Sequence, residues 1–333
     1  MPQIIHDEIQ EVSKGVECRS SHVPLGIVAS ITPFNFPIMV PMWTIPNAIV
    51  LGNCMILKPS EQTPVGASKI AELLKKSGLP DGVFNVINGD KNIVEAICDH
   101  EDISAISFVG STKIAKNVYQ RTTSNFKRCL SLGGAKNHLI VLPDANEEMA
   151  SNDIIASMSG CAGQRCMAAS AMLGVGKIDS IINKVANKAK TIVAGKNLGS
   201  VISEEAKIRI EKYIEEAEKN GAKIILDGRG VKVSGKENGY YVGPTILDYV
   251  KPEMKIAQEE VFGPVLAIMR TNEIDEAIAI ENNSQYGNAS SVYTQDGNLA
   301  NYVTERVSAG MLSLIHISEP TRPRLISYAV FCL

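Results

Sequence analysis

The sequence lacks the features that mark several large classes of protein. Its 33 lysines and arginines nearly balance 36 aspartates and glutamates, so the net charge of -3 offers no basic surface for nucleic acid or an anionic membrane. Its apolar runs are interrupted well before the length that spans a bilayer, and the amino end lacks the basic and apolar pattern of a secretion signal. We therefore expect a globular protein whose partner is a small molecule, with no nucleic acid and no membrane partner.

The seven cysteines follow no disulfide framework. Their number is odd and they are dispersed along the chain, which is typical of reduced thiols in a cytoplasmic protein. No second pair follows Cys161 and Cys166, so a structural zinc site is not indicated. We expect a cytoplasmic location and no metal.

The first part of the chain alternates between apolar runs and helical patterns. With 333 residues, 45% of them hydrophobic, the chain can form two domains of moderate size. Strands are expected at 26–31, 55–57, 83–87, 103–109 and 129–132, and helices at 41–51, 64–77, 91–98 and 111–119. This alternation predicts an α/β fold with a doubly wound parallel sheet, which binds ligands at the carboxyl ends of its strands.

The regions on either side are less regular. Ile5, Ile9 and Val12 at helical spacing predict a short amphipathic helix within residues 1–21. In the second half, helices are expected at 177–193, 204–220, 274–282 and 299–307, and strands at 223–226, 240–242 and 265–269.

A stretch of small and polar residues, 159–170, holds the candidate nucleophile Cys166. Gly160 and Gly163 allow the backbone to approach a ligand closely, and Arg165 is a nearby cation that favours the thiolate. A thiolate can attack a carbonyl and form a covalent adduct. The local chemistry leaves open the alternative that Cys166 is a small buried hydrophobic residue.

Three of the expected strands end in candidate binding residues. Asn35 follows the first strand in a loop rich in proline and aromatic residues, where its amide can donate to a developing oxyanion. Lys58 and Glu61 follow the second strand and can bracket ribose hydroxyls. Ser111 opens a helix after the fourth strand, where free amides and a hydroxyl can hold phosphate. Structural turns and a plain helix cap are the alternatives.

Six motifs, in the same order, resemble the aldehyde dehydrogenase superfamily. They are Pro33-Phe-Asn-Phe-Pro37, Lys58-Pro-Ser-Glu-Gln-Thr-Pro64, Phe108-Val-Gly-Ser-Thr112, Leu132-Gly-Gly134, Gly163-Gln-Arg-Cys166 and Glu259-Glu-Val-Phe-Gly-Pro264. The resemblance implies NAD-dependent oxidation of an aldehyde, with Cys166 as the nucleophile and Asn35 with the Cys166 amide as the oxyanion hole. It implies that NAD is bound by Thr32, Phe34, Lys58, Ser60, Glu61, Gly110, Ser111, Glu260 and Phe262.

One departure from the superfamily pattern changes the expected reaction. Members that hydrolyse their thioester have a glutamate just before Leu132-Gly-Gly134, whereas the stretch 129–138 of this chain has no carboxylate on either plausible alignment. A longer-lived thioester can be passed to a thiol, so coenzyme A is the expected acceptor. The stretches 134–138 and 163–167 are similar to the branch that oxidises methylmalonate or malonate semialdehyde and releases propionyl-CoA or acetyl-CoA with loss of CO2. Hydrolysis with another base, such as Glu260, is the alternative.

A semialdehyde that carries a carboxylate needs a cation near the nucleophile. We assign this role to Arg165, whose guanidinium can grip a carboxylate at two points; an internal ion pair is the alternative. His138 is expected to be structural.

Both ends of the chain depart from the superfamily pattern. The first part of the cofactor domain is missing, and residues 313–333 resemble translated sequencing adapter and are expected to be disordered. We therefore expect a partial NAD-binding domain at 1–133, a catalytic domain at 134–312 and a foreign tail at 313–333. The family would form homo-oligomers, but the contact segments are missing here, and a truncated chain without catalytic activity is a further alternative.

Overall fold

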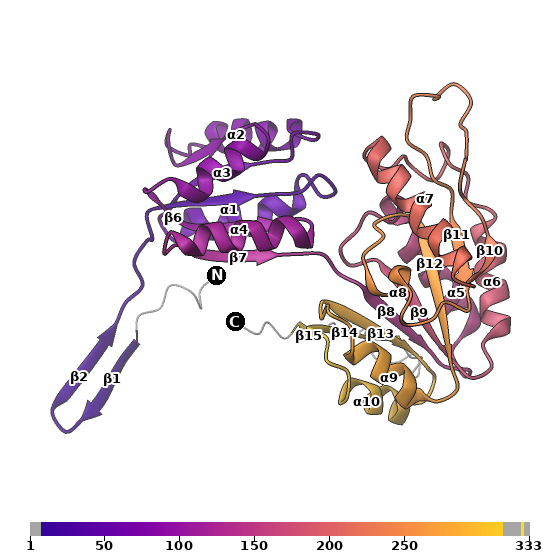
Figure 1. The fold of residues 1–333 in the computed structure, drawn as a ribbon. Coiled ribbons are helices and arrows are strands. Elements are labelled where there is room, and N and C mark those ends of the chain that lie inside the picture. Colours follow the sequence, from indigo (N-terminus) through magenta and orange to yellow (C-terminus); the bar gives the residue numbers. More distant parts are fainter. Residues whose placement is uncertain (1–7, 316–327, 330–333) are drawn as a thin grey trace. The chain divides into compact units, whose positions relative to one another are not determined.

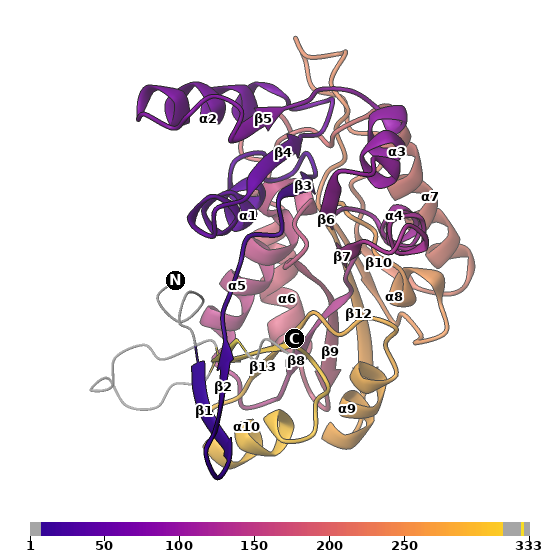
Figure 2. The same cartoon turned by 90° about the vertical axis from the view of Figure 1, so that its left-hand side faces the viewer.

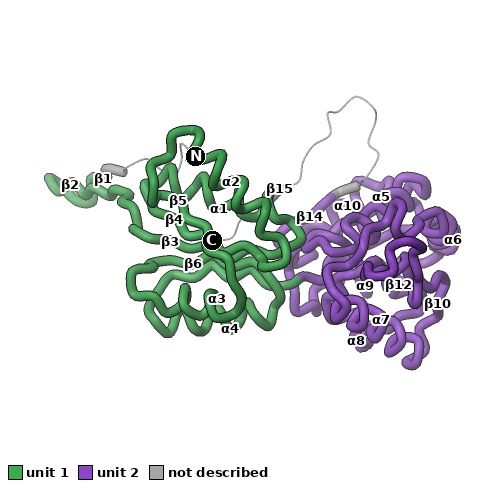
Figure 3. The backbone as a smooth tube through the Cα atoms, turned by 90° about the horizontal axis from the view of Figure 1, so that it is seen from above, with its two compact units in different colours: residues 1–134 green, residues 135–333 purple. Residues whose placement is uncertain are grey.

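The computed structural model describes residues 8–315 and 328–329. The chain divides into two compact units, residues 1–134 and 135–333 (Figure 3). Each unit has its own sheets and its own apolar clusters. Among the described helices, none is both long and apolar enough to cross a bilayer.

Residues 8–20 form a β-hairpin, so the helix predicted within residues 1–21 is wrong for this part, while Ile5 lies outside the described residues. Strand β1 (Glu8–Ser13) pairs antiparallel with β2 (Val16–Ser20) in a separate two-stranded sheet (Figure 1). Gly15 turns the chain between them with a φ of 78°, in the left-handed region that favours glycine. This turn brings β1 and β2 side by side. The spacing of the apolar residues in so short a segment did not reveal the turn.

Unit 1 contains a fully parallel five-stranded sheet in the order β5-β4-β3-β6-β7. Its strands are β3 (Ile27–Ile31), β4 (Cys54–Lys58), β5 (Phe84–Val86), β6 (Ile103–Val109) and β7 (Arg128–Leu132). Its helices are α1 (Met39–Val50), α2 (Val65–Lys76), α3 (Lys91–Asp99) and α4 (Thr112–Ser124). This confirms the predicted doubly wound sheet.

The two faces of this sheet bury different clusters. Met55 and Leu57 of β4 pack with residues of α1 and α2, whereas Ile106 and Phe108 of β6 pack with residues of α3 and α4. Successive side chains along a strand point to opposite faces of the sheet. Neighbouring residues of one strand can therefore belong to different clusters. The helices between consecutive parallel strands thereby cover both faces.

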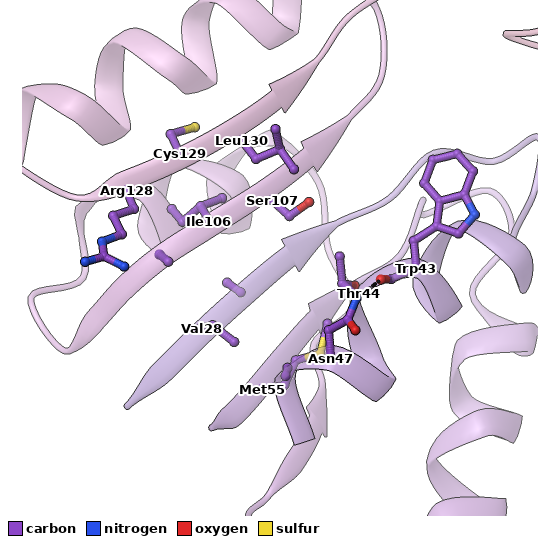
Figure 4. A pocket seen from close by; sticks show the side chains of 13 residues that line it. Val28, Trp43, Thr44, Asn47, Met55, Ile106, Ser107, Arg128, Cys129 and Leu130 are labelled. Carbon is purple, nitrogen blue, oxygen red and sulfur yellow. Dashed lines mark hydrogen bonds between the residues drawn. The ribbon is translucent and has the colours of Figure 1, made fainter. Parts of the chain in front are cut away.

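A groove of about 430 Å³ lies on one face of the unit 1 sheet beside α1 (Figure 4). Trp43 and Asn47 of α1 line one side, and Leu130 of β7 lines the other. Its lining runs along the middle of the strands and not beyond their carboxyl ends. The groove is therefore separate from the edge at which the sequence places nucleotide-binding residues.

Unit 2 contains an eight-stranded sheet in the order β10-β11-β12-β9-β8-β13-β14-β15. Its strands are β8 (Asn137–Val141), β9 (Ala169–Val175), β10 (Lys223–Leu226), β11 (Thr245–Asp248), β12 (Val265–Thr271), β13 (Ala289–Tyr293), β14 (Met311–Ile315) and β15 (Tyr328–Ala329). The six central strands are parallel, and the outer pairs β10·β11 and β14·β15 are antiparallel. Figure 2 shows β8, β9 and β12 at the centre of this arrangement.

Helices pack on both faces of the unit 2 sheet. They are α5 (Glu147–Ser159), the short 3-10 turn η2 (Gly160–Gly163), α6 (Asp179–Ala189), α7 (Glu204–Lys219), α8 (Lys255–Gln258), α9 (Ile274–Asn282) and α10 (Gly297–Thr304). Residues of α5 and α6 belong to one apolar cluster, and residues of α7, α9 and α10 belong to the other. Asn146 begins α5 by accepting the Met149 N–H, and Ser203 begins α7 by accepting the Ala206 N–H.

Unit 2 differs from expectation in several regions, and strands β8, β9 and β13 were not predicted. Residues 240–242 are not a strand; β11 follows at Thr245–Asp248, where the Thr245 N–H donates to the Pro264 carbonyl oxygen and the strand pairs with β12. Helix α5 was not predicted, because its apolar residues do not gather on one face. Ser313–Ile315 of the expected tail continue β14, and the rest of 313–333 lies outside the described residues except for β15.

Candidate active site

Cys166 lies in the loop between η2 and β9, and two asparagines hold its backbone. The Asn137 side chain donates from Nδ2 to the Cys166 carbonyl oxygen at 2.8 Å, and Asn288 donates from Nδ2 to the same oxygen at 3.2 Å. Asn137 is buried at the start of β8, and its Oδ1 accepts the Ala289 N–H at 3.2 Å. The loop is therefore tied to two neighbouring strands of the sheet.

The backbone before Cys166 adopts an unusual conformation. Cys161 and Ala162 have φ values of 52° and 53°, in the left-handed region that residues with a Cβ adopt rarely. Gly163 follows with a φ of 72°, and a Cβ there would lie 2.0 Å from the Gly263 carbonyl oxygen. Only glycine fits at 163, because the cysteine loop lies directly on the 259–264 segment.

The thiol of Cys166 is partly buried and its pKa is raised. Burial is the main cause, and the negative charge of Glu260 adds to it, while the N–H groups of Cys166 and Met167 act in the opposite direction. The prediction that a nearby cation favours the thiolate at rest is wrong, because the guanidinium of Arg165 is directed elsewhere. The resting group is a thiol with a carboxylate beside it.

Arg165 holds the end of helix α5. Its Nη2 donates to the carbonyl oxygens of Ala156 and Ser157 at 2.6 and 3.0 Å, and its buried Nε has no hydrogen-bond partner among the described residues. A cation at the carboxyl end of a helix stabilises the last carbonyls. The side chain is next to the nucleophile in sequence, but in this conformation it orients the loop. Binding of a substrate carboxylate stays a prediction.

Glu260 faces the thiol loop from the segment between α8 and β12. Its Oε1 accepts the Ala135 N–H at 3.2 Å, and burial raises its pKa above the ordinary value, against the opposing effects of this bond and of the charges on Lys136 and Arg209. Phe262, two residues on, has a φ of 53°. Glu260 and Cys166 thus both lie in unit 2, where the charge of Glu260 acts on the thiol.

Several residues of this site escaped the sequence analysis. Lys136, Asn137, Arg209 and Asn288 surround the cysteine loop or Glu260. Lys136 and Asn137 belong to a motif that we used only to identify a branch, and Arg209 and Asn288 carry no local signal. His138, in the same motif, is buried against the Glu281 carboxylate, in keeping with a structural role.

Unit 1 gathers the expected nucleotide-binding residues at one edge of its sheet. Strands β4, β3 and β6 are parallel neighbours, so the residues after their carboxyl ends share that edge. The Thr32 N–H donates to the Lys58 carbonyl oxygen at 3.0 Å, and Thr32 Oγ1 is buried with no hydrogen-bond partner among the described residues. Phe34 and Asn35 continue from Thr32 in the loop after β3.

A charged pair and a helix start complete this edge. Lys58 Nζ lies 2.8 Å from Glu61 Oε2, and this hydrogen bond is the main reason that the pKa of Glu61 is lowered. Ser60 lies between them in sequence, and Ser111 stands at the start of α4 without a side-chain capping bond. An orphan hydroxyl, an ionised carboxylate and an uncapped helix start fit the hydroxyl and phosphate groups of a dinucleotide.

Gly110 and Ser131 border this edge on its other side. A Cβ at Gly110 would lie 2.6 Å from the Phe108 ring, so glycine keeps the turn before α4 tight. Ser131, in the stretch without a carboxylate, donates from Oγ to the Ala115 carbonyl oxygen at 2.7 Å. The Ser131 hydroxyl therefore donates its hydrogen bond to the backbone of α4. No group of three or more His, Cys, Asp or Glu side chains within the described ranges can hold a metal ion.

The family model described as "Aldehyde dehydrogenase family" matches residues 1–324. The chain is 44% identical over 317 residues to malonate-semialdehyde dehydrogenase 1 of Geobacillus kaustophilus, covering 93% of this chain and 65% of that protein. It is 42% identical to the mitochondrial acylating methylmalonate-semialdehyde/malonate-semialdehyde dehydrogenase of Rattus norvegicus, covering 93% and 59%.

A solved structure agrees with these relatives. A Sinorhizobium meliloti protein, to which methylmalonate-semialdehyde dehydrogenase activity is ascribed and which was crystallised with NAD, superposes with a TM-score of 0.91 at 42% identity, covering 94% of this chain and 66% of that one. The chain therefore spans slightly less than two thirds of the length of these proteins. The ordered motifs, the parallel sheets and the family match together show that the chain belongs to the aldehyde dehydrogenase family.

Proposed function

We propose that this chain carries the active site of an NAD-dependent, coenzyme A-acylating dehydrogenase for malonate or methylmalonate semialdehyde. The observation that carries the proposal is the fixed cysteine loop facing Glu260, together with the stretch 129–138, which has no carboxylate. The names of the two relatives and of the solved structure support the same chemistry.

The oxidation begins at Cys166. Its thiol loses a proton and the sulfur adds to the aldehyde carbon, so that a tetrahedral oxyanion forms. We assign the amide of Asn35 and the N–H of Cys166 as the donors that stabilise this oxyanion. NAD, when bound, supplies the hydride acceptor. Loss of hydride from the former aldehyde carbon leaves a thioester on Cys166.

The residues at the unit 1 edge are proposed to hold NAD. Lys58 and Glu61 suit the adenosine ribose, since the carboxylate can accept hydrogen bonds from the ribose hydroxyls and the Lys58 ammonium holds the carboxylate in place. Gly110 and Ser111 are proposed to bind the phosphates. Other contacts with NAD are assigned to Thr32, Phe34 and Ser60. Glu260 and Phe262 are assigned to the nicotinamide end. A 2′-phosphate would be repelled by ionised Glu61, which favours NAD over NADP.

The thioester is proposed to pass to coenzyme A. Ser131 cannot act as a strong base toward water, so the thioester persists until the coenzyme A thiolate attacks its carbonyl carbon and Cys166 leaves as thiolate. The substrate carboxylate departs as CO2 and a proton takes its place, which gives acetyl-CoA from malonate semialdehyde or propionyl-CoA from its methyl homologue. Arg165 is proposed to bind that carboxylate. Its guanidinium would then give up a hydrogen bond to a carbonyl oxygen of α5.

Some broader expectations stay predictions. They are the division into a partial NAD-binding domain (1–133), a catalytic domain (134–312) and a tail (313–333), the cytoplasmic location, and a homo-oligomeric family state. A second function, hydrolysis of the thioester, is favoured by one observation: the raised pKa of Glu260, beside the thiol, suits a base for water.

The test is NADH formation at 340 nm from purified chain, NAD and each semialdehyde, with and without coenzyme A. We expect turnover that requires coenzyme A and falls at least about 10³-fold in Cys166→Ala. Cys161→Ala, which removes an exposed thiol of the same loop, is the matched control and should stay active. Turnover without coenzyme A would favour the hydrolytic function. No NADH from either semialdehyde would overturn the proposal and leave a noncatalytic chain.

A further inference from the structure

Lys136 is a buried cation without a partner. It lies between Ala135 and the first residue of β8, is only 3% exposed, and its Nζ has no hydrogen-bond partner among the described residues. Burying an unpaired ammonium group costs several kcal/mol, about enough to unfold a marginal domain, so such a group needs a compensating charge nearby. Burial lowers the pKa of Lys136 to about 8, so the ammonium form persists at neutral pH.

The nearest compensating charge is Glu260. The residue before Lys136, Ala135, donates its N–H to Glu260 Oε1 at 3.2 Å, which fixes the carboxylate beside the start of β8. The charge of Lys136 lowers the pKa of Glu260, and the charge of Glu260 raises the pKa of Lys136. Each group therefore favours the ionised form of the other.

Three charged or titratable groups act on or respond to Glu260, and they come from three elements. Lys136 approaches from the start of β8, Arg209 from α7, where its Nη1 donates to the Val261 carbonyl oxygen at 2.6 Å, and Cys166 from the loop before β9. Arg209 is held by that backbone bond, and the charge of Glu260 raises the pKa of Cys166. Glu260 therefore links Lys136 to the thiol.

We propose that Lys136 is a positioning residue whose buried charge keeps Glu260 ionised and, through Glu260, restrains ionisation of the Cys166 thiol. The restraint has a chemical use, because the thiolate and not the thiol is the form attacked by oxidants and alkylating agents. It also keeps Glu260 an acceptor for hydrogen bonds from a ligand, because an ionised carboxylate only accepts. The inference rests on Cys166 as the reactive thiol of the proposed function, but not on the acceptor of the acyl group.

The experiment follows alkylation of Cys166 by iodoacetamide from pH 6 to 10, with modification located by peptide mass. Glu260→Gln should speed alkylation at neutral pH by roughly 3- to 10-fold, since a like charge beside the thiol is removed. Lys136→Met should speed it about 2- to 5-fold near pH 6 to 7, because Glu260 then keeps its proton to higher pH. The effect of Lys136→Met should vanish above about pH 9, because Lys136, whose pKa is about 8, is then neutral in the parent chain as well.

The double variant separates a charge effect from a structural one. In the Glu260→Gln background, Lys136→Met should leave the alkylation profile unchanged, and Lys136→Arg alone should behave as the parent chain. If Lys136→Met changes the profile equally in both backgrounds, or in neither, the proposal is overturned. Should Lys136→Met fail to fold, Lys136→Gln takes its place in the same cycle. Alkylation needs neither NAD nor coenzyme A, so a chain without dehydrogenase activity still tests this inference independently of the proposed function.

Discussion

The two groups of candidate residues, one in each unit, are built by different means. In unit 1, short motifs follow adjacent parallel strands, so the topology alone brings Thr32, Lys58 and Ser111 to one edge. In unit 2, the thiol depends on buried side chains and on a loop with left-handed backbone. Strand-end residues tolerate change in their surroundings, whereas a clamped loop does not. Substitutions should therefore damage unit 2 more than unit 1.

The largest effect is expected from Gly163→Ala. A Cβ at this position meets the Gly263 carbonyl oxygen at 2.0 Å, and the φ of 72° disfavours alanine as well. Backbone clashes of this kind cost more than about 4 kcal/mol. Urea unfolding of the full chain should show this loss. Gly199→Ala is the control, because nothing lies within 4 Å of its added Cβ. Equal stabilities of the two variants would contradict the packing of the two loops.

The second effect concerns Lys136 and the pH dependence of stability. Its pKa is about 8 in the folded chain and 10.5 ordinarily, so between these values the unfolded chain binds more protons and stability rises with pH. The separation corresponds to about 3 kcal/mol. Urea unfolding is measured at pH 7 and at pH 10 for the parent chain and for Lys136→Met. The rise in stability with pH should be larger in the parent chain, and groups that Lys136 does not influence cancel in the difference between the two chains. A pH-independent difference would show that Lys136 is not buried as a cation.

The sequence also predicts unit 1 better than unit 2. Nearly every element of unit 1 was predicted within a few residues, because its strands are separated by helices with clear starts and stops, as at Gly78 after α2. The cysteine was identified from its motif. The direction of the Arg165 side chain was not, since sequence proximity to Cys166 says nothing about which carbonyls accept its protons. Lys136 was missed because burial of a lysine has no sequence signal.

The third effect tests the clamp on the cysteine loop. Asn137→Ala removes the 2.8 Å bond to the Cys166 carbonyl oxygen and leaves the Ala289 N–H without its acceptor, so about 1–3 kcal/mol of stability should be lost. Asn288→Ala removes the longer bond from an exposed side chain and should cost less than about 1 kcal/mol. Thermal unfolding of both variants checks the order. If Asn288→Ala costs more stability than Asn137→Ala, the main anchor of the loop is Asn288, directly before β13.

The smallest effect is expected at the nucleotide edge of unit 1. Lys58→Met removes the partner of Glu61, and the carboxylate then loses the hydrogen bond that orients it toward a ribose, so the KM for NAD should rise about 10-fold with little change in kcat. Lys69→Met breaks an ion pair of the same spacing, with Glu72, on an exposed face of α2 and should leave the KM unchanged. Steady-state rates over a range of NAD concentrations check both. If Lys58→Met instead lowers kcat alone, Lys58 acts on the reaction and not on cofactor binding, and the division of labour between the two units is wrong.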